Sequence, residues 1–371
     1  MQKLTRKLFI SIFTAVFALV TLGATTFAWF TLTTTVSIEE FEAEITSGTG
    51  IEVSLDGVGF SSYISTSEIV TRIKNKNFGG PTGSIVLDAV TTATGYDQFK
   101  VLVIPDEEDL EPEDEVVPEL RDVVGEKWIF FELYFRTPYQ SDTQETWVYM
   151  LTESYITSDG FTWISDATFD DAMYDAGGTP TEHILNVGDT KEIFACNSLR
   201  MSFLTHQVDT TKIGGLDPIG EATETVVIYE LDPDIEPSNP WDGNNRLDSE
   251  LKPYGSIDYY RVKSGVADYD LLEIFSDEEG QQLEGLLPEG VLNSSHLVEK
   301  SALSGDMTGK YAIVKLETPD ANQRYYYGVV KVQMWIEGWD PDCYNAIMAA
   351  DLKIGLSFGG SNVEPNTNPQ G

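Results

Sequence analysis

The sequence predicts an all-β (mainly β) protein, an antiparallel sandwich with loop insertions and a few short helices, preceded by an N-terminal hydrophobic helix. Three observations support this prediction. Apolar and polar residues alternate at 51–55 and again at 330–336, which is the period of a half-buried strand. Runs of β-branched and aromatic residues recur between these ends, and helical patterns are confined to short pieces such as 67–74 and 268–275. A parallel α/β fold needs regular crossover helices, so the pattern disfavours it.

Residues 1–28 have the layout of an export signal. Three basic residues lie within the first seven positions, a charge-free apolar run follows at 8–22, and small residues then lead to Ala28. This order is typical of a signal peptide. Uncharged residues continue to Ile38, so the segment is also long enough to span a bilayer as an uncleaved signal anchor. In either case the chain is expected to be extracellular or at the cell surface, with membrane contact only through an uncleaved leader.

Residues 29–358 are expected to form one β domain. Its predicted strands are runs bounded by Gly, Pro and Asp, and the most distinct are 51–55, 128–135, 146–151, 199–204, 225–231, 311–316, 330–336 and 352–358. Stretches rich in Pro, Gly and acids predict solvated insertions near 105–122, 232–256 and 276–290. The polar tail 359–371 is expected to be disordered.

The chain is a strong polyanion, with a formal net charge of -38 at pH 7. Nucleic acid is therefore not an expected partner, because its phosphates would be repelled. Calcium is the only cofactor that this composition favours, since hard cations bind carboxylate oxygens in acidic turns. Asp340 and Asp342 flank Pro341 in such a turn and are the predicted ligands. A solvated acidic loop without a metal is the alternative.

Only two cysteines are present, Cys196 and Cys343. This number excludes a disulfide-rich scaffold and a multi-cysteine zinc site. Outside the cell the two could form a disulfide, which would close a long loop and stabilise the chain by about 4 to 5 kcal/mol. Two separate buried thiols are the alternative.

The motifs of catalysis do not support an enzyme, so no catalytic or cofactor-binding residue is predicted. Residues 355–359 match GxSxG in letters, but no helix is predicted after Ser357 and no histidine lies downstream. The three histidines have no metal-ligand spacing, and the chain has no phosphate-binding glycine motif.

The junction after the leader carries a family resemblance. Ala28 is followed by two aromatic residues, Trp29 and Phe30, and then by Thr and Ser residues that lead into the first predicted strand. In this the chain resembles the exported TasA- and camelysin-like proteins of Gram-positive bacteria and their wall-less relatives. The segments 128–138, 198–204, 226–234 and 332–343 look like strands of related jelly-roll surface proteins.

The resemblance implies a jelly-roll-type sandwich and a subunit of an extracellular matrix or biofilm fibre. Self-association, or contact with other surface or matrix proteins, is the implied partnership. The chain departs from the family in its larger size, its stronger acidity and the absence of an Asp after the aromatic pair. Because fold alone does not confer function, assembly rests on analogy at this point.

The segment after the junction offers a physical route to assembly. It contains Phe30, Leu32, Val36, Ile38 and Phe41, and neither Pro nor Gly interrupts it. Such a segment can complete the sheet of a neighbouring copy by strand addition. The alternative is that it forms the first strand of its own sandwich.

A second functional class stays open beside the structural subunit. The chain could be a monomeric carbohydrate- or protein-binding module held at the membrane by an uncleaved leader. Trp241 and Trp339 lie in predicted loops, where an indole ring can stack on a sugar. Tryptophans in loops also pack locally, so these residues do not name a ligand.

Overall fold

The structure is a computed structural model. It describes residues 35–38, 41–47, 50–92, 94–103, 119–123, 127–139, 141, 145–171, 173–174, 180–181, 184–231, 255–264, 291–320, 322, 324–338, 340, 342–344, 352–363 and 365. The predicted leader, the helix predicted at 268–275, Trp241 and Trp339 lie outside these residues. Within the described ranges, no helix is both long and apolar enough to cross a membrane.

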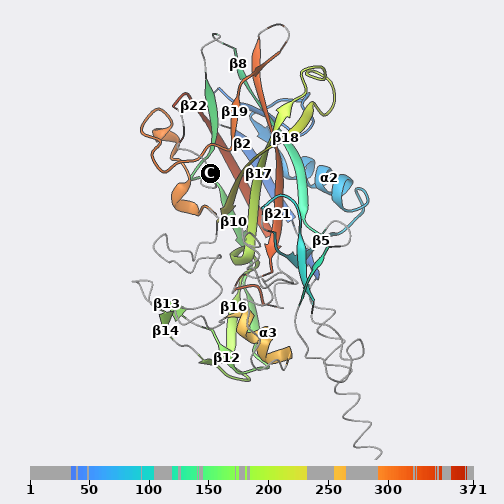
Figure 1. The fold of residues 1–371 in the computed structure, drawn as a ribbon, viewed down its shortest axis with the longest axis vertical. Helices are drawn as coiled ribbons and strands as arrows, with labels where there is room; N and C mark the ends of the chain where they lie inside the picture. Colours follow the sequence, from blue (N-terminus) through green and yellow to red (C-terminus); the bar gives the residue numbers. More distant parts are fainter. Residues whose placement is uncertain are drawn as a thin grey trace, which may run out of the picture.

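Two large sheets dominate the described part of the chain (Figure 1). Sheet A contains eight described strands, namely β1 (Thr35–Ile38), β3 (Glu52–Ser54), β5 (Ile85–Val90), β8 (Ile129–Pro138), β17 (Leu199–Val208), β18 (Ile219–Glu230), β20 (Thr318–Pro319) and β21 (Tyr325–Glu337). Sheet B contains six, namely β2 (Phe41–Ser47), β4 (Tyr63–Ile64), β9 (Thr146–Met150), β10 (Tyr155–Ser158), β19 (Val314–Leu316) and β22 (Leu352–Ser361). The predicted mainly β architecture is therefore confirmed.

Most neighbouring strands are antiparallel, as predicted, while β2 with β22 and β5 with β21 are parallel pairs. Along the path of sheet A the order is β1, β5, β21, β17, β18, and along that of sheet B it is β19, β9, β22, β2, β4. Consecutive strands often belong to different sheets, so the chain crosses repeatedly between the two layers.

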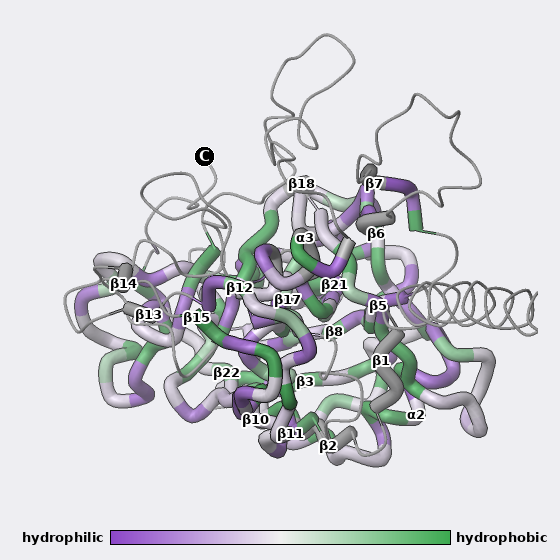
Figure 2. Tube along the Cα trace, turned by 90° about the horizontal axis from the view of Figure 1, so that it is seen from below, coloured by the Kyte–Doolittle hydropathy of each residue, from purple (hydrophilic) through white to green (hydrophobic). Residues whose placement is uncertain are grey.

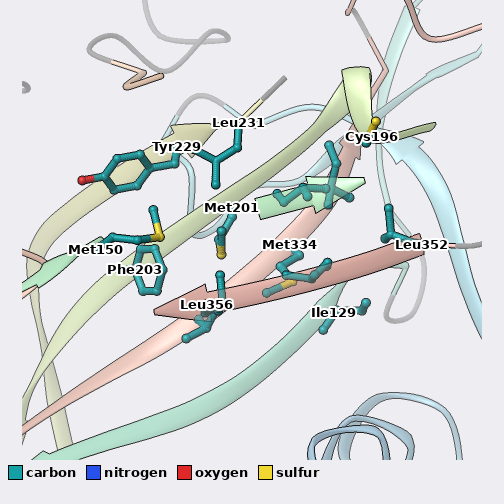
Figure 3. Packing of buried hydrophobic residues seen from close by; sticks show 14 of the residues in the cluster. Ile129, Met150, Cys196, Met201, Phe203, Tyr229, Leu231, Met334, Leu352 and Leu356 are labelled. Carbon is teal, nitrogen blue, oxygen red and sulfur yellow. The ribbon is translucent and has the colours of Figure 1, made fainter. Parts of the chain in front are cut away.

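Aromatic and aliphatic side chains join the two layers. The ring of Phe358 in sheet B meets the rings of Phe135 and Phe203 in sheet A edge to face, with centroids 5.1 and 6.1 Å apart. Met201 and Met334 belong to the same cluster of buried side chains as these rings (Figure 3). Burying a side chain of this size stabilises the fold by about 1.5 to 3 kcal/mol. Hydrophobic and hydrophilic residues are interspersed along the tube of the chain (Figure 2).

One helix, α2 (Thr66–Asn77), covers the predicted helical stretch 67–74. Ser65 precedes it and forms a capping box with Glu68, whose carboxylate accepts the backbone N–H of Ser65 at 2.9 Å. Ile69 and Ile73 are fully buried against the main core. The amphipathic spacing and the cap together explain why this stretch is helical in a β protein.

A small lobe lies below the sandwich (Figure 1). It consists of β11 (Phe161–Ile164), β12 (Phe169–Asp170), β13 (Met173–Tyr174), β14 (Pro180–Thr181), β15 (Ile184–Leu185), β16 (Thr190–Ile193) and α3 (Ser256–Ser264). Its core is an aromatic cluster of Trp163, Phe169 and Tyr259, which Tyr344 joins from the segment after β21. A separate hairpin pairs β6 (Lys100–Val103) with β7 (Glu119–Asp122).

Three stretches that were predicted as insertions or tail contain described secondary structure. Residues 119–122 of the predicted insertion 105–122 form strand β7, and the insertion 232–256 ends on a buried residue, Ser256, which begins α3. Strand β22 continues past 358 to Ser361, so the first residues of the predicted tail belong to sheet B. Gly359 and Gly360 permit this, because a Cβ there would lie 2.7 Å from Leu303 and 2.6 Å from Ile51.

Candidate functional site

The N-terminal strand β2 lies inside sheet B, between β22 and β4. It runs parallel to β22 in register from Phe41 beside Leu352 to Ser47 beside Phe358. On its other side it pairs with β4 over two residues only. The pairing with β22 is thus the main backbone attachment of β2 within sheet B.

The side chain of Ile45 anchors β2 in the core. It is 1% exposed, and its register partners Leu356 in β22 and Ile64 in β4 are 2% and 5% exposed. Strand β2 is therefore a core strand in the single chain.

Strand β1 attaches the same segment to the other sheet. It forms the edge of sheet A and pairs with β5, with Val36 beside Leu87 and Ile38 beside Ile85. Because β1 joins sheet A and β2 joins sheet B, the segment 35–47 links the two layers.

Of the residues predicted for strand addition, Val36, Ile38 and Phe41 occupy strands of their own chain. Phe30 and Leu32 lie outside the described residues. Within one chain the segment thus takes the position that the alternative interpretation gave it. Exchange of this segment between copies stays a prediction.

Two glycines follow β2 directly, in the sequence Gly48, Thr49, Gly50. Gly50 has φ +85° and no atom within 4 Å of the position where a Cβ would be. Glycine adopts such a conformation without steric cost. At Gly50 the backbone is therefore free of the steric restraint that a side chain would impose.

The acidic turn predicted to bind calcium is partly buried. Asp340 is 3% exposed, and its Oδ1 accepts hydrogen bonds from the backbone N–H of Asp342 at 2.8 Å and the hydroxyl of Ser198 at 3.4 Å. Asp342 is more exposed and lies 3.6 Å from the Lys191 amine. Across the described ranges, no group of three or more His, Cys, Asp and Glu side chains is placed to hold a metal ion. Calcium binding at Asp340 and Asp342 stays a prediction.

Both cysteines are buried as thiols. Cys196 lies in the 3-10 helix η2 (Ala195–Ser198), and Cys343 follows the acidic turn. The two segments touch, because the hydroxyl of Ser198 reaches the Asp340 carboxyl. Burial, and next the charge of Asp340, raise the pKa of the Cys343 thiol. The disulfide between the two cysteines stays a prediction.

Sequence reasoning missed a buried charged cluster at the base of sheet A. The guanidinium of Arg200 in β17 binds the carboxylates of Glu230 in β18 at 2.9 Å and of Glu337 in β21 at 3.0 Å. All three side chains are buried, and the Trp335 indole N–H also reaches Glu337 at 3.3 Å. The available signal was a charged residue within or at the end of an apolar run in each of three strands, where a buried charge requires a partner.

Comparison with known proteins identified no relative of this chain. No family model matches the chain, and neither a curated protein nor a solved structure matches it. The proposals below therefore rest on the residues of the chain itself.

Proposed function

We propose that the chain is an exported structural subunit of the cell surface or of an extracellular, biofilm-like matrix, and that copies assemble by exchanging the segment 35–47. One observation supports this above the others. Strand β2 pairs with β22 over seven residues and places Ile45 in the core of sheet B, it follows directly on β1 at the start of the described chain, and the sequence Gly48, Thr49, Gly50 comes after it.

The energetics of exchange favour such a subunit. A copy that receives β2 from a neighbour recovers the same seven register pairs with β22 and the same buried Ile45. Contacts within the chain are then replaced by identical contacts between chains, so exchange has a low thermodynamic cost. Because donor and acceptor positions are different surfaces, the contact propagates from copy to copy unless it closes into a ring.

The topology is compatible with a jelly-roll-type sandwich, which belongs to the same proposal. Successive strands often belong to different sheets, and the first two described strands join different layers. Long-range pairing of this kind is typical of Greek-key and jelly-roll folds.

The negative charge of the chain should make its assembly depend on the salt concentration. The mature subunit is strongly acidic, so copies repel one another at low ionic strength. Salt shortens the range of this repulsion to about 10 Å at 0.1 M. Assembly is therefore expected to accelerate with added salt, and further with divalent cations that bind the carboxylates.

A peptide competition experiment tests the proposal. Mature protein is allowed to polymerise, followed by light scattering and electron microscopy, with an excess of a synthetic peptide of residues 29–47. We expect the peptide to stop growth by filling the β2 position. The control peptide carries Ile45→Asp, which cannot enter the core, and should have no effect.

Two outcomes would contradict the proposal. A mature protein that stays strictly monomeric at high concentration, with and without Ca²⁺, would leave the monomeric binding module as the better interpretation. Equal effects of the two peptides would show that growth does not depend on the β2 position.

A further inference from the structure

Lys191 and Asp171 form an ion pair inside the small lobe. Lys191 belongs to β16, and Asp171 directly follows β12. The Nζ atom of Lys191 lies 2.6 Å from Oδ1 of Asp171. The aspartate side chain is 9% exposed and the lysine side chain 24%. An amine and a carboxyl, the two groups from which an amide bond is made, are thus held in contact with little access of water to the carboxyl.

The pair borders the aromatic cluster of the small lobe. Trp163 is the register partner of Lys191 across β11 and β16, and its ring centroid lies 5.0 Å from that of Tyr259 and 5.3 Å from that of Tyr344. The Lys191 amine lies 4.6 Å from the centre of the Tyr344 ring. Separated charges are poorly hydrated beside such rings, so a neutral product gains over the ion pair.

Tyr344 binds the same carboxylate oxygen as the lysine. Its hydroxyl donates to Oδ1 of Asp171, and the Lys191 amine also donates to the Tyr344 oxygen at 3.2 Å. Two donors on one oxygen draw electron density away from Cγ, which makes Cγ more electrophilic and Oδ1 a better leaving group. Because the groups are already in place, no encounter in solution is needed before they react.

A second lysine pair in the same lobe lacks this arrangement. The Lys263 amine lies 2.8 Å from Oδ2 of Asp166, whereas the Tyr259 hydroxyl donates to Oδ1 at 3.1 Å. The two donors therefore bind different oxygens. The Asp166 side chain is also 46% exposed, so water hydrates its charge. We expect this pair to remain an ordinary ion pair.

We propose that Lys191 and Asp171 condense into an intramolecular amide (isopeptide) bond in the folded protein. Two protons pass from the Lys191 ammonium to Oδ1, the nitrogen forms a bond to Cγ, and the bond between Cγ and Oδ1 breaks. Oδ1 leaves with the two protons as one water molecule, and Oδ2 becomes the amide oxygen. The ion pair and its products contain the same atoms and the same net charge, so the step needs no oxidant, reductant or further reactant.

The bond joins the end of β12 to β16 across the small lobe. The described strands between them, β13, β14 and β15, have two residues each, so backbone pairing alone attaches this stretch weakly. A covalent link between residues 171 and 191 closes this loop and restricts the unfolded chain, as a disulfide does. Unlike a disulfide, an amide is not opened by reduction.

Mass spectrometry of the mature protein, incubated until its mass is constant, tests the proposal. Residues 137–190 contain neither Lys nor Arg, so trypsin should cleave after Arg136 and next after Lys191. The amide bond blocks cleavage after Lys191. We therefore expect an internally linked peptide of residues 137–200 that is lighter than its sequence by one water molecule. The Lys191→Arg variant keeps the positive charge, and it should have its full mass and be cleaved after residue 191.

The Lys263→Arg variant is the matched control at the exposed pair, and it should keep both the mass loss and the blocked cleavage. An aspartyl succinimide also lacks one water molecule, but it leaves Lys191 open to trypsin. Folded wild-type protein that has its full mass and is cleaved after Lys191 would overturn the proposal. A water loss that persists in Lys191→Arg would do so as well, because it would not involve the lysine amine.

Discussion

Ile45 and Leu356 are register partners in the parallel strands β2 and β22, and both side chains are buried in the core between the sheets. This contact joins an early strand of the chain to a late one. The stability of the domain and the proposed exchange between copies therefore depend on the same pair.

Truncation of Ile45 should destabilise the protein strongly. We expect Ile45→Ala to lower the free energy of unfolding by about 2 to 5 kcal/mol, because it removes buried methyl groups and leaves a cavity. The control Ile164→Ala removes the same atoms from a side chain that is 62% exposed. It should change the free energy of unfolding by less than about 0.5 kcal/mol. Urea unfolding measures both. A similar small effect for the two variants would contradict the core position of β2.

Removal of the buried Arg200 guanidinium should lower the free energy of unfolding more than removal of an exposed guanidinium does. Arg200→Met leaves the carboxylates of Glu230 and Glu337 buried without their positive partner. We therefore expect the free energy of unfolding to fall by about 3 to 5 kcal/mol. Arg324→Met removes the ion pair with Asp320, in which the arginine side chain is 69% exposed. This variant should lower the free energy of unfolding by at most about 1 kcal/mol. Denaturant unfolding distinguishes them. A loss below about 1 kcal/mol for Arg200→Met would show that the cluster tolerates the missing charge.

Gly57 lies after strand β3 and approaches Pro218 closely. It has φ +73°, and a Cβ there would lie 2.4 Å from the Pro218 ring. Gly214 also has positive φ, at +84°, but no atom lies within 4 Å. Both alanine variants incur backbone strain, and only Gly57→Ala adds overpacking, so it should be less stable than Gly214→Ala by about 1 to 3 kcal/mol. Equal thermal midpoints would contradict the close approach of the two turns.

His296 should make stability fall on acidification. Burial lowers the pKa of His296 below its ordinary value of 6.5, and its Nδ1 accepts the backbone N–H of Asn293 at 3.2 Å. The unfolded chain therefore binds a proton more readily between the lowered pKa and 6.5, and the stabilisation present above 6.5 is lost as the pH falls through the folded pKa. The His296→Gln variant should lack this loss. A constant stability difference between the two proteins from neutral to acidic pH would contradict it.

The sequence could predict the large strands because their signals are local. The apolar runs at 199–204 and 225–231 lie in β17 and β18, and the alternation at 330–336 lies in β21. The same is true of α2, whose cap and spacing are contained in a dozen residues. Strands and helices with such periodicity are readable without knowledge of their partners.

The small lobe and the buried cluster could not be predicted because tertiary contacts define them. Strands β12 and β15 are two residues each and carry no period, and the aromatic ring of Tyr344 reaches their cluster from far along the chain. Likewise the pairing of Arg200 with Glu337 joins residues 137 positions apart. Only the topology brings such residues together. The calcium turn, the disulfide and the export of the chain remain predictions.

The most direct test of the central claim is whether β2 of one copy lies beside β22 of another copy. Thr46 in β2 and Ser357 in β22 are register partners in this parallel pair of strands. Mature Thr46→Cys and Ser357→Cys proteins are mixed, allowed to assemble and treated with a short thiol cross-linker. The account predicts covalent dimers from the mixture, and none when Thr46→Cys is replaced by Thr211→Cys, which lies in an exposed turn. A mixture that yields no dimers, while the double variant Thr46→Cys/Ser357→Cys cross-links within single chains, would contradict strand exchange.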